Sequence, residues 1–266
     1  MASYNINEVE PIEVRRIFTG FPELDWLYGY STYEGKIKWG IPMKSISLWS
    51  GESGTGKSRI AIALAKNLAN SGLRVLYFQN ETDLGTFSQW IKNGVTKPEN
   101  FRISDDKKLE DQIRIIKRDN PHVVFIDSVN MIEEFKSGTK KDIELIVNSF
   151  KEICKERLIH IILIAQLNQD GSVKGSSTLP HLVDIAFNLK KDDELDGLFS
   201  IEVGIKHRYG RTGPTYKTIW EHEEDGIICL SDSRLLDKKW NGGKKFLFPV
   251  LEEKKKEGFF DFLLKK

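Results

Sequence analysis

Residues Gly51 to Ser58 read Gly-Glu-Ser-Gly-Thr-Gly-Lys-Ser and match the pattern G-x-x-x-x-G-K-[ST]. An apolar, β-prone run at 45–49 precedes them, and a helical pattern at 59–65 follows. Glycines in such a turn let backbone N–H groups point at phosphate, and the helix start adds the positive end of its dipole. The Lys57 ammonium can reach β- and γ-phosphate oxygens, and the Ser58 hydroxyl can ligate Mg²⁺.

This P-loop predicts that the chain binds ATP with Mg²⁺. The candidate nucleotide-binding residues are Gly51, Glu52, Ser53, Gly54, Thr55, Gly56, Lys57 and Ser58.

Three polar residues stand at the ends of further predicted strands. Asp127 closes the apolar run 122–126, where a P-loop protein keeps the carboxylate that holds Mg²⁺ through water. Glu81 follows the second strand and could polarise the attacking water, or it could be a solvated acid in a loop. Gln166 ends the run 160–165 and could sense the γ-phosphate, or it could cap the strand end. Asp83 and Ser128 are weaker candidates for the same tasks.

The elements that must position these residues alternate between strand and helix. Strands are predicted at 45–49, 74–78, 101–104, 122–126 and 160–165, and helices at 59–65, 86–91, 109–118 and 142–157. Such alternation predicts an α/β fold, a P-loop NTPase core with a mostly parallel sheet and helices on both faces.

The pattern changes after residue 180. Three β-prone runs, at 198–205, 215–220 and 227–230, predict a C-terminal antiparallel extension, with Asp225-Gly226 as a turn. We therefore expect an N-terminal extension at 1–17, an ATPase domain at 18–232 and a basic, aromatic C-terminal tail at 233–266.

Bulk composition sets limits on partners and location. The net charge of the 266 residues is +1, so any nucleic-acid contact must come from local patches. The two cysteines, Cys154 and Cys229, form no C-x-x-C zinc motif. No apolar run is long enough to span a membrane, and the N-terminus lacks a signal-peptide profile. We expect a cytoplasmic protein.

Several sequence blocks resemble the RecA-like ATPases, especially the bacterial RadA (Sms) branch. Residues 19–25, Thr-Gly-Phe-Pro-Glu-Leu-Asp, are similar to the opening T-G-x-x-E-L-D of that family. Residues 170–175 and 179–184 are similar to the K-E-G-x-x-A-G-P…L-E-H-M-V-D block. Residues 206–210, Lys-His-Arg-Tyr-Gly, are similar to K-N-R-F-G. Within the P-loop superfamily, the blocks at 179–184 and 206–210 therefore indicate the RadA/DnaB side.

The likeness covers residues 18–230 and also has features of DnaB-type replicative helicases. Residues 165–168, Ala-Gln-Leu-Asn, are close to the S-Q-L-N of those helicases. One departure is at 28–36, where an aromatic stretch replaces the family's glycine run. A four-cysteine zinc finger, a Lon-like domain and the N-terminal helical domain of DnaB have no counterpart in this sequence.

The resemblance implies a RecA-like core that binds ATP between the subunits of a homo-oligomeric ring, usually a hexamer. Glu81 would then be the base that activates water, and Gln166 would couple the γ-phosphate to DNA-binding loops. Lys206 and Arg208 would reach the phosphates of the neighbouring subunit and stabilise transition-state charge. Without the family resemblance, Lys206 and Arg208 would be interpreted as two exposed basic residues at a strand end.

Two loops of RecA-like rings face the central channel, and here they would be 130–141 and 168–179. Their lysines are candidates for contacts with DNA phosphates: Lys136, Lys140, Lys141 and Lys174. The alternative is a pair of solvated loops, and Glu133 and Glu134 weaken the first patch.

The tail carries nine lysines against five acids, with interleaved aromatics. It could grip single strands, dock on a protein partner, or pack as a final helix on the core or a neighbouring subunit.

Together these features predict an ATP hydrolase of the RadA/DnaB type that acts on single-stranded DNA in recombination, repair or replication. The alternatives are a KaiC-like regulatory ATPase that switches protein partners by nucleotide state, and a nucleotide-dependent scaffold with little turnover.

Overall fold

The computed structural model describes Asn5, Asn7 and residues 13–92, 94–168, 171–191, 198–213, 215–222 and 228–235. The expected turn at 225–226 and the tail beyond residue 235 lie outside the described residues. No described helix is long and apolar enough to cross a membrane.

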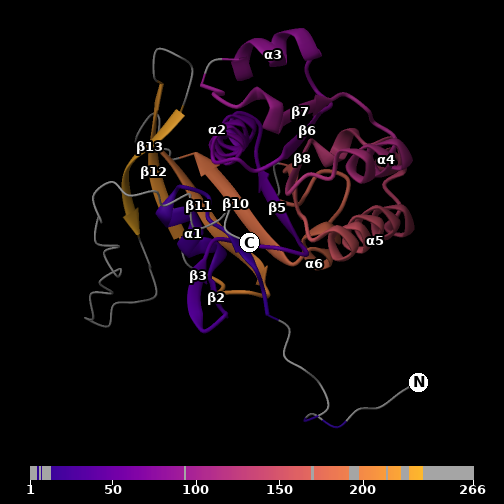
Figure 1. Ribbon diagram of the computed structural model, residues 1–266. Helices are drawn as coiled ribbons and strands as arrows, with labels where there is room; N and C mark the ends of the chain where they lie inside the picture. Colours follow the sequence, from indigo (N-terminus) through magenta and orange to yellow (C-terminus); the bar gives the residue numbers. More distant parts are fainter. Residues whose placement is uncertain are drawn as a thin grey trace.

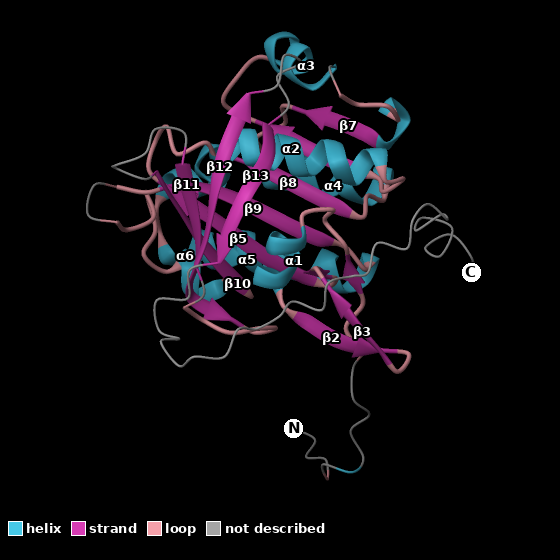
Figure 2. Ribbon diagram, turned by 90° about the vertical axis from the view of Figure 1, so that its left-hand side faces the viewer, coloured by secondary structure: helices cyan, strands magenta, loops and turns pink. Residues whose placement is uncertain are grey.

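A nine-stranded sheet forms the centre of the fold, in the order β13-β12-β11-β10-β5-β9-β8-β6-β7. Six neighbouring strands are parallel: β10 (Ile185–Lys191), β5 (Ser45–Gly51), β9 (His160–Gln166), β8 (Val123–Asp127), β6 (Val75–Gln79) and β7 (Phe101–Ser104). The strands β11 (Leu198–His207), β12 (Thr215–His222) and β13 (Ile228–Leu235) continue the sheet in antiparallel fashion. In Figure 2, β12 and β13 run steeply across the view, as the sheet twist requires.

Helices cover both faces of the parallel strands because successive strand residues point to opposite sides. On one face, Trp49 and Tyr77 join a core with α1 (Pro22–Tyr28), α2 (Lys57–Asn70) and α3 (Leu84–Lys92). On the other, Leu48 and Phe78 join α4 (Leu109–Asp119) and α5 (Lys140–Arg157), beside the short α6 (Leu179–Leu182). Figure 1 shows these two groups of helices on either side of the sheet. The expected fold class, an α/β core with an antiparallel extension, is confirmed.

Several short elements were not expected from the sequence. A hairpin of β2 (Tyr30–Tyr33) and β3 (Lys36–Trp39) occupies the stretch that departs from the family's glycine run. It lies at the lower end of the molecule in Figure 1. β1 (Arg16–Ile17) pairs with β4 (Ile41–Pro42), so the end of the expected N-terminal extension is part of the folded unit.

Residues 130–141 do not form the loop that the family resemblance implied. They form two 3₁₀ segments, η3 (Val129–Met131) and η4 (Glu133–Ser137), followed by the first turn of α5. Burial of Val129, Ile132 and Phe135 explains the order, because these apolar side chains anchor the segment on the core. Lys140 and Lys141 therefore lie on a helix.

A fully buried imidazole joins the starts of β5 and β9. One ring nitrogen of His160 lies 2.9 Å from Ser45 Oγ and 3.0 Å from the Pro42 carbonyl oxygen, and the other lies 2.9 Å from Ser47 Oγ. Burial lowers the pKa of His160 to about 3, although its contact with the Pro42 carbonyl raises it somewhat. The native protein therefore keeps this ring neutral through most of the acidic range.

We expect His160 to make the protein sensitive to mild acid. Its pKa falls from an ordinary 6.5 to about 3 on folding, so between these values the unfolded chain takes up the proton and the native chain does not. Stability is therefore lost as the pH falls, by about 2 kcal/mol between pH 7 and pH 5. Urea unfolding of the wild type and of His160→Gln at both pH values measures this, and equal pH dependence in the two proteins would contradict it.

Candidate nucleotide site

The P-loop connects β5 directly to α2, with a backbone that suits an anion. Gly54 and Gly56 have φ of 81° and 77°, a left-handed conformation that a side chain would strain. Because α2 begins at Lys57 behind Gly56, the first N–H groups of the helix have no partner within the helix itself. This arrangement fits a phosphate group, as the sequence predicted.

The Lys57 ammonium is folded back over the loop. Its Nζ donates hydrogen bonds to the carbonyl oxygens of Gly51, at 2.8 Å, and Glu52, at 2.6 Å. Burial lowers the pKa of Lys57, while the charges of Asp127, Glu81 and Glu52 raise it. A phosphate is a stronger acceptor than these carbonyls, so the buried cation is well suited to hold one.

Asp127 lies at the end of β8, beside β6 and β9. Its Oδ2 accepts a hydrogen bond of 2.7 Å from the Tyr77 hydroxyl, and the Ser58 hydroxyl is a second partner. Burial raises the pKa of Asp127 to about 6, whereas the hydrogen bonds from Tyr77 and Ser58 lower it. Tyr77 was not among the predicted site residues, because a tyrosine inside an apolar strand is typical of a core residue.

The Ser58–Asp127 pair fits a Mg²⁺ ion. A hydroxyl and a carboxylate are hard oxygen donors, and Mg²⁺ with a nucleotide commonly uses only one or two protein ligands. Within the described part of the chain, no cluster of three or more His, Cys, Asp or Glu could hold a metal. Ser58 and Asp127 would hold the ion, which would neutralise charge developing on the phosphates.

Glu81 is held at the same edge of the sheet by two side chains. Its Oε1 accepts hydrogen bonds from Ser128 Oγ, at 2.7 Å, and from Gln166 Nε2, at 3.4 Å. The structure therefore brings Glu81 and Gln166 together next to Lys57 and Asp127. A carboxylate fixed in this way can accept a proton from water. Because Gln166 donates to Glu81, the Gln166 side chain can follow a change in the position of that carboxylate.

Asn80 is a buried polar residue that the sequence did not single out. The residue is 3% exposed, and its Nδ2 and Oδ1 have no hydrogen-bond partner among the described residues. Its backbone N–H donates to the Asp127 carbonyl oxygen at 2.8 Å. An unsatisfied buried amide lowers the stability of the fold. Because Asn80 lies between β6 and Glu81, its retention there is consistent with a functional site at this edge of the sheet.

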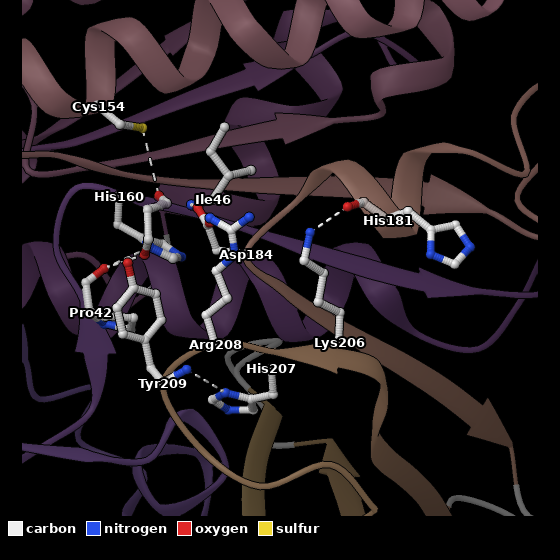
Figure 3. Close-up of polar contacts among 11 residues, drawn as sticks. Pro42, Ile46, Cys154, His160, His181, Asp184, Lys206, His207, Arg208 and Tyr209 are labelled. Carbon is white, nitrogen blue, oxygen red and sulfur yellow. Dashed lines mark hydrogen bonds and ion pairs between the residues drawn. The ribbon is translucent and has the colours of Figure 1, made fainter. Parts of the chain in front are cut away.

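Lys206 and Arg208 lie at the opposite end of the sheet from the P-loop of their own chain. β11 runs antiparallel to β10, and His207 is level with Ile185, which pairs with Ser47 near the start of β5. Lys206 Nζ donates to the His181 carbonyl oxygen, and Arg208 Nη1 lies 2.9 Å from Asp184 Oδ1 (Figure 3). Within one chain these cations therefore cannot complete the nucleotide site.

The turn that carries Arg208 is fixed from several sides. His207 Nε2 lies 2.7 Å from the Leu27 carbonyl oxygen, and the Tyr209 N–H donates to His207 Nδ1 at 3.2 Å, the contact drawn in Figure 3. Arg16 Nη2 donates to the Tyr209 carbonyl oxygen at 3.4 Å, and its Nη1 donates to the carbonyl oxygens of Tyr28 and Gly29 at 3.0 Å. The N-terminal strand and α1 thus brace the Lys206–Gly210 block, a role that its sequence motif does not reveal.

The four candidate DNA-binding lysines do not lie on two equivalent loops. Lys136 is exposed on η4, and Lys174 is exposed in the turn after β9. Lys140 is in the first turn of α5 and forms an ion pair of 3.7 Å with Glu144. The expectation of flexible loops is wrong for Lys140 and Lys141, because Thr139 caps α5 by accepting from the Asp142 N–H.

We expect Lys57→Ala to weaken nucleotide binding and to abolish most hydrolysis. Removing a buried charge-assisted contact to phosphate costs about 1.5–3 kcal/mol, or roughly 10- to 150-fold in affinity. Titration with a fluorescent ATP analogue measures the loss. Lys66→Ala is the control: this lysine of α2 is also buried, but its Nζ donates to the Trp90 carbonyl oxygen, away from the P-loop. An unchanged affinity in Lys57→Ala would contradict the assignment.

Comparison with known proteins agrees with this geometry. A family model described as "AAA domain" matches residues 7–172, which include the P-loop, Glu81, Asp127 and Gln166. The chain belongs to this family. It is a RecA-like P-loop ATPase with similarity to RadA proteins, as the sequence motifs predicted.

Curated relatives include proteins called DNA repair protein RadA. The chain is 26% identical over 260 residues to the one from Aquifex aeolicus, covering 94% of this chain and 54% of the relative. It is 31% identical over 200 residues to the one from Rickettsia prowazekii, covering 73% and 44%. The chain thus spans about half the length of these relatives.

Among solved structures, the "ATPase Domain of G40P" matches with a TM-score of 0.59 at 19% identity, covering 71% of this chain and 85% of that one. At this identity the match bears on the fold alone.

Proposed function

We propose that this chain hydrolyses ATP with Mg²⁺ and couples hydrolysis to single-stranded DNA, in the manner of the RadA and DnaB-type ATPases. The observation that carries the proposal is the hydrogen-bonded group of Glu81, Ser128 and Gln166 beside Lys57 and Asp127. Glu81 accepts the proton of the attacking water, and Lys57 compensates the phosphate charge. Relatives named for DNA repair support the DNA-directed role.

We propose further that the active form is a homo-oligomer, with a hexameric ring as the expected arrangement. Lys206 and Arg208 lie far from their own P-loop, so they can stabilise transition-state charge only in a neighbouring subunit. Arg208 must then release Asp184, with which it pairs in the isolated chain. The site is therefore completed by the partner copy, and oligomerisation is part of the catalytic proposal.

The DNA contact in this proposal rests mainly on Lys136 and Lys174. Both are exposed, and the segments that carry them meet: a Cβ on Gly175 would lie 3.0 Å from the Phe135 ring. Repetition around a ring multiplies a modest positive charge into a basic channel, without any reading of base sequence.

The test is the rate of ATP hydrolysis with and without single-stranded DNA, together with the mass of the protein in the presence of ATP. We expect DNA to increase the rate and binding to weaken with salt. In Lys174→Ala the slope of log affinity against log salt should fall by about 0.7, because one phosphate of the single strand is no longer neutralised. If hydrolysis ignores DNA and no DNA is retained at low salt, the DNA-directed function is wrong.

A KaiC-like regulatory ATPase is the second candidate. It is favoured by the ion pair of Lys140 with Glu144, because this carboxylate offsets part of the positive charge that Lys140 offers to DNA. Such a protein would capture a protein partner in a way that depends on Lys57 but not on Lys136 or Lys174. A pull-down with the three corresponding alanine variants separates the two functions.

A further inference from the structure

The side chain of Asn130 bridges the nucleotide site and the segment that carries Lys174. Its Oδ1 accepts a hydrogen bond from the Gln166 N–H at 3.1 Å, and its Nδ2 donates to the Lys174 carbonyl oxygen at 2.5 Å. Asn130 itself lies on η3, two residues after Ser128, which donates to Glu81. One amide therefore touches both the γ-phosphate candidate Gln166 and the DNA-binding candidate Lys174.

Gln166, at one end of the Asn130 bridge, is linked to the nucleotide site by hydrogen bonds. The Gln166 side chain reaches Glu81 at 3.4 Å, and the next residue, Leu167, donates its N–H to the Gly51 carbonyl oxygen at 3.0 Å. Gly51 is the first residue of the P-loop. A change in either Glu81 or the P-loop thus reaches the end of β9 through direct hydrogen bonds.

Lys174, at the other end of the Asn130 bridge, is also fixed by backbone contacts. The Lys174 N–H donates to the Gln166 carbonyl oxygen at 2.8 Å, and Leu167 forms an antiparallel β-bridge with Val173, a residue that is 4% exposed. With Asn130 in place, both the N–H and the carbonyl of Lys174 are fixed relative to Gln166. Its backbone is therefore expected to follow the end of β9 instead of moving independently.

We propose that Asn130 is the positioning residue that transmits the nucleotide state from Gln166 to Lys174. The inference rests on the proposed function, because it names the link between the two halves of that function. A ligand that shifts Gln166 favours one arrangement of the strand end, and the Asn130 amide extends this arrangement to Lys174. Without the amide, Lys174 keeps a single backbone hydrogen bond to Gln166, and the coupling weakens.

The test uses the full chain as wild type, Asn130→Ala and Asn130→Asp. Asn130→Asp keeps the acceptor for the Gln166 N–H but faces the Lys174 carbonyl with a carboxylate. Asn70→Ala is the matched control: the Asn70 amide also bridges two backbone groups, the Gly94 carbonyl at 2.7 Å and the Thr96 N–H at 2.8 Å, in contacts that involve neither Gln166 nor Lys174. Thermal unfolding of all variants checks that they fold.

Two measurements are made on each protein. The first is hydrogen exchange of the Lys174 amide with and without a slowly hydrolysed ATP analogue. In wild type and Asn70→Ala we expect nucleotide to slow exchange by about tenfold or more, and in both Asn130 variants by less than about twofold. The second is the ratio of hydrolysis rates with and without single-stranded DNA, which should fall close to one in the Asn130 variants only.

The outcomes separate this inference from the function on which it rests. If the Asn130 variants keep the nucleotide effect on Lys174, or if Asn70→Ala loses it equally, the inference is wrong. A wild type without any nucleotide effect on Lys174 also overturns it. If the nucleotide effect depends on Asn130 but DNA never stimulates hydrolysis, the link is supported and the DNA-directed function fails.

Discussion

Glu81→Gln is expected to bind ATP as the wild type does and to lose about 10²- to 10⁴-fold of its turnover, the usual contribution of general acid–base catalysis. The amide keeps the size of the carboxylate and can still accept from Ser128 and Gln166, which contact Oε1 at 2.7 and 3.4 Å. It cannot, however, accept a proton from water at neutral pH. Binding should survive because Lys57 and the P-loop are unchanged.

The measurement pairs single-turnover hydrolysis with an equilibrium titration of a fluorescent ATP analogue. Glu99→Gln is the control, because Glu99 is an exposed carboxylate on the 3₁₀ helix at 98–100, before β7. Turnover in Glu81→Gln close to that of Glu99→Gln would remove Glu81 from the chemical step. Little turnover in the wild type and in both variants would instead support the scaffold alternative, in which nucleotide binding alone carries the function.

Lys206→Ala is expected to hydrolyse ATP about 10³-fold or more slowly when it is the only species present, the loss known for trans-acting charged groups at phosphoryl transfer. Lys57→Ala should be equally poor, because it lacks the ammonium that binds phosphate in its own site. When the two inactive variants are mixed, a Lys57→Ala subunit can offer its intact Lys206 to the intact P-loop of a Lys206→Ala neighbour. Random mixing in equal amounts should restore about one quarter of the sites.

The control for this experiment is Lys151→Ala. Lys151 lies on α5, and its charge contributes to the lowered pKa of Lys206, whose largest cause is burial. Lys151 lies outside the 206–210 motif, so replacing it should leave the result of the mixing experiment unchanged. If the mixture of Lys57→Ala and Lys206→Ala stays inactive although the subunits exchange, the shared site is wrong. Full activity of Lys206→Ala alone would have the same meaning.

Much of the fold was predictable because its signals are local. The runs at 45–49, 122–126 and 160–165 are apolar and β-prone, and the structure has β5, β8 and β9 there. The strand β10 was missed because residues 185–191 follow directly on a family motif and end in lysines. The hairpin at 30–39 was missed for another reason: each strand has only 4 residues and none of them is buried, so the pattern is too short to stand out.

The residues of the candidate site also divide into those that the sequence predicted and those that it did not. Lys57 was predicted from the P-loop motif, and Glu81, Asp127 and Gln166 were predicted because polar residues at strand ends stand out against apolar runs. Tyr77 and Asn130 were not, since a strand tyrosine and a loop asparagine are common in structural roles. Their partners, Asp127 and Lys174, are distant in sequence and carry no local mark of the contact.

The sequence by itself determined that a phosphate-binding turn, a set of strand-end carboxylates and a basic Lys206–Gly210 block exist in this chain, because residue type and spacing are local properties. Only the tertiary structure decided which of them meet. The strand order β5-β9-β8-β6 brings Gly51, Gln166, Asp127 and Glu81 to one edge of the sheet, and the antiparallel β11 carries Lys206 to the other. Strand order depends on non-local packing, so no spacing in the sequence encodes it directly.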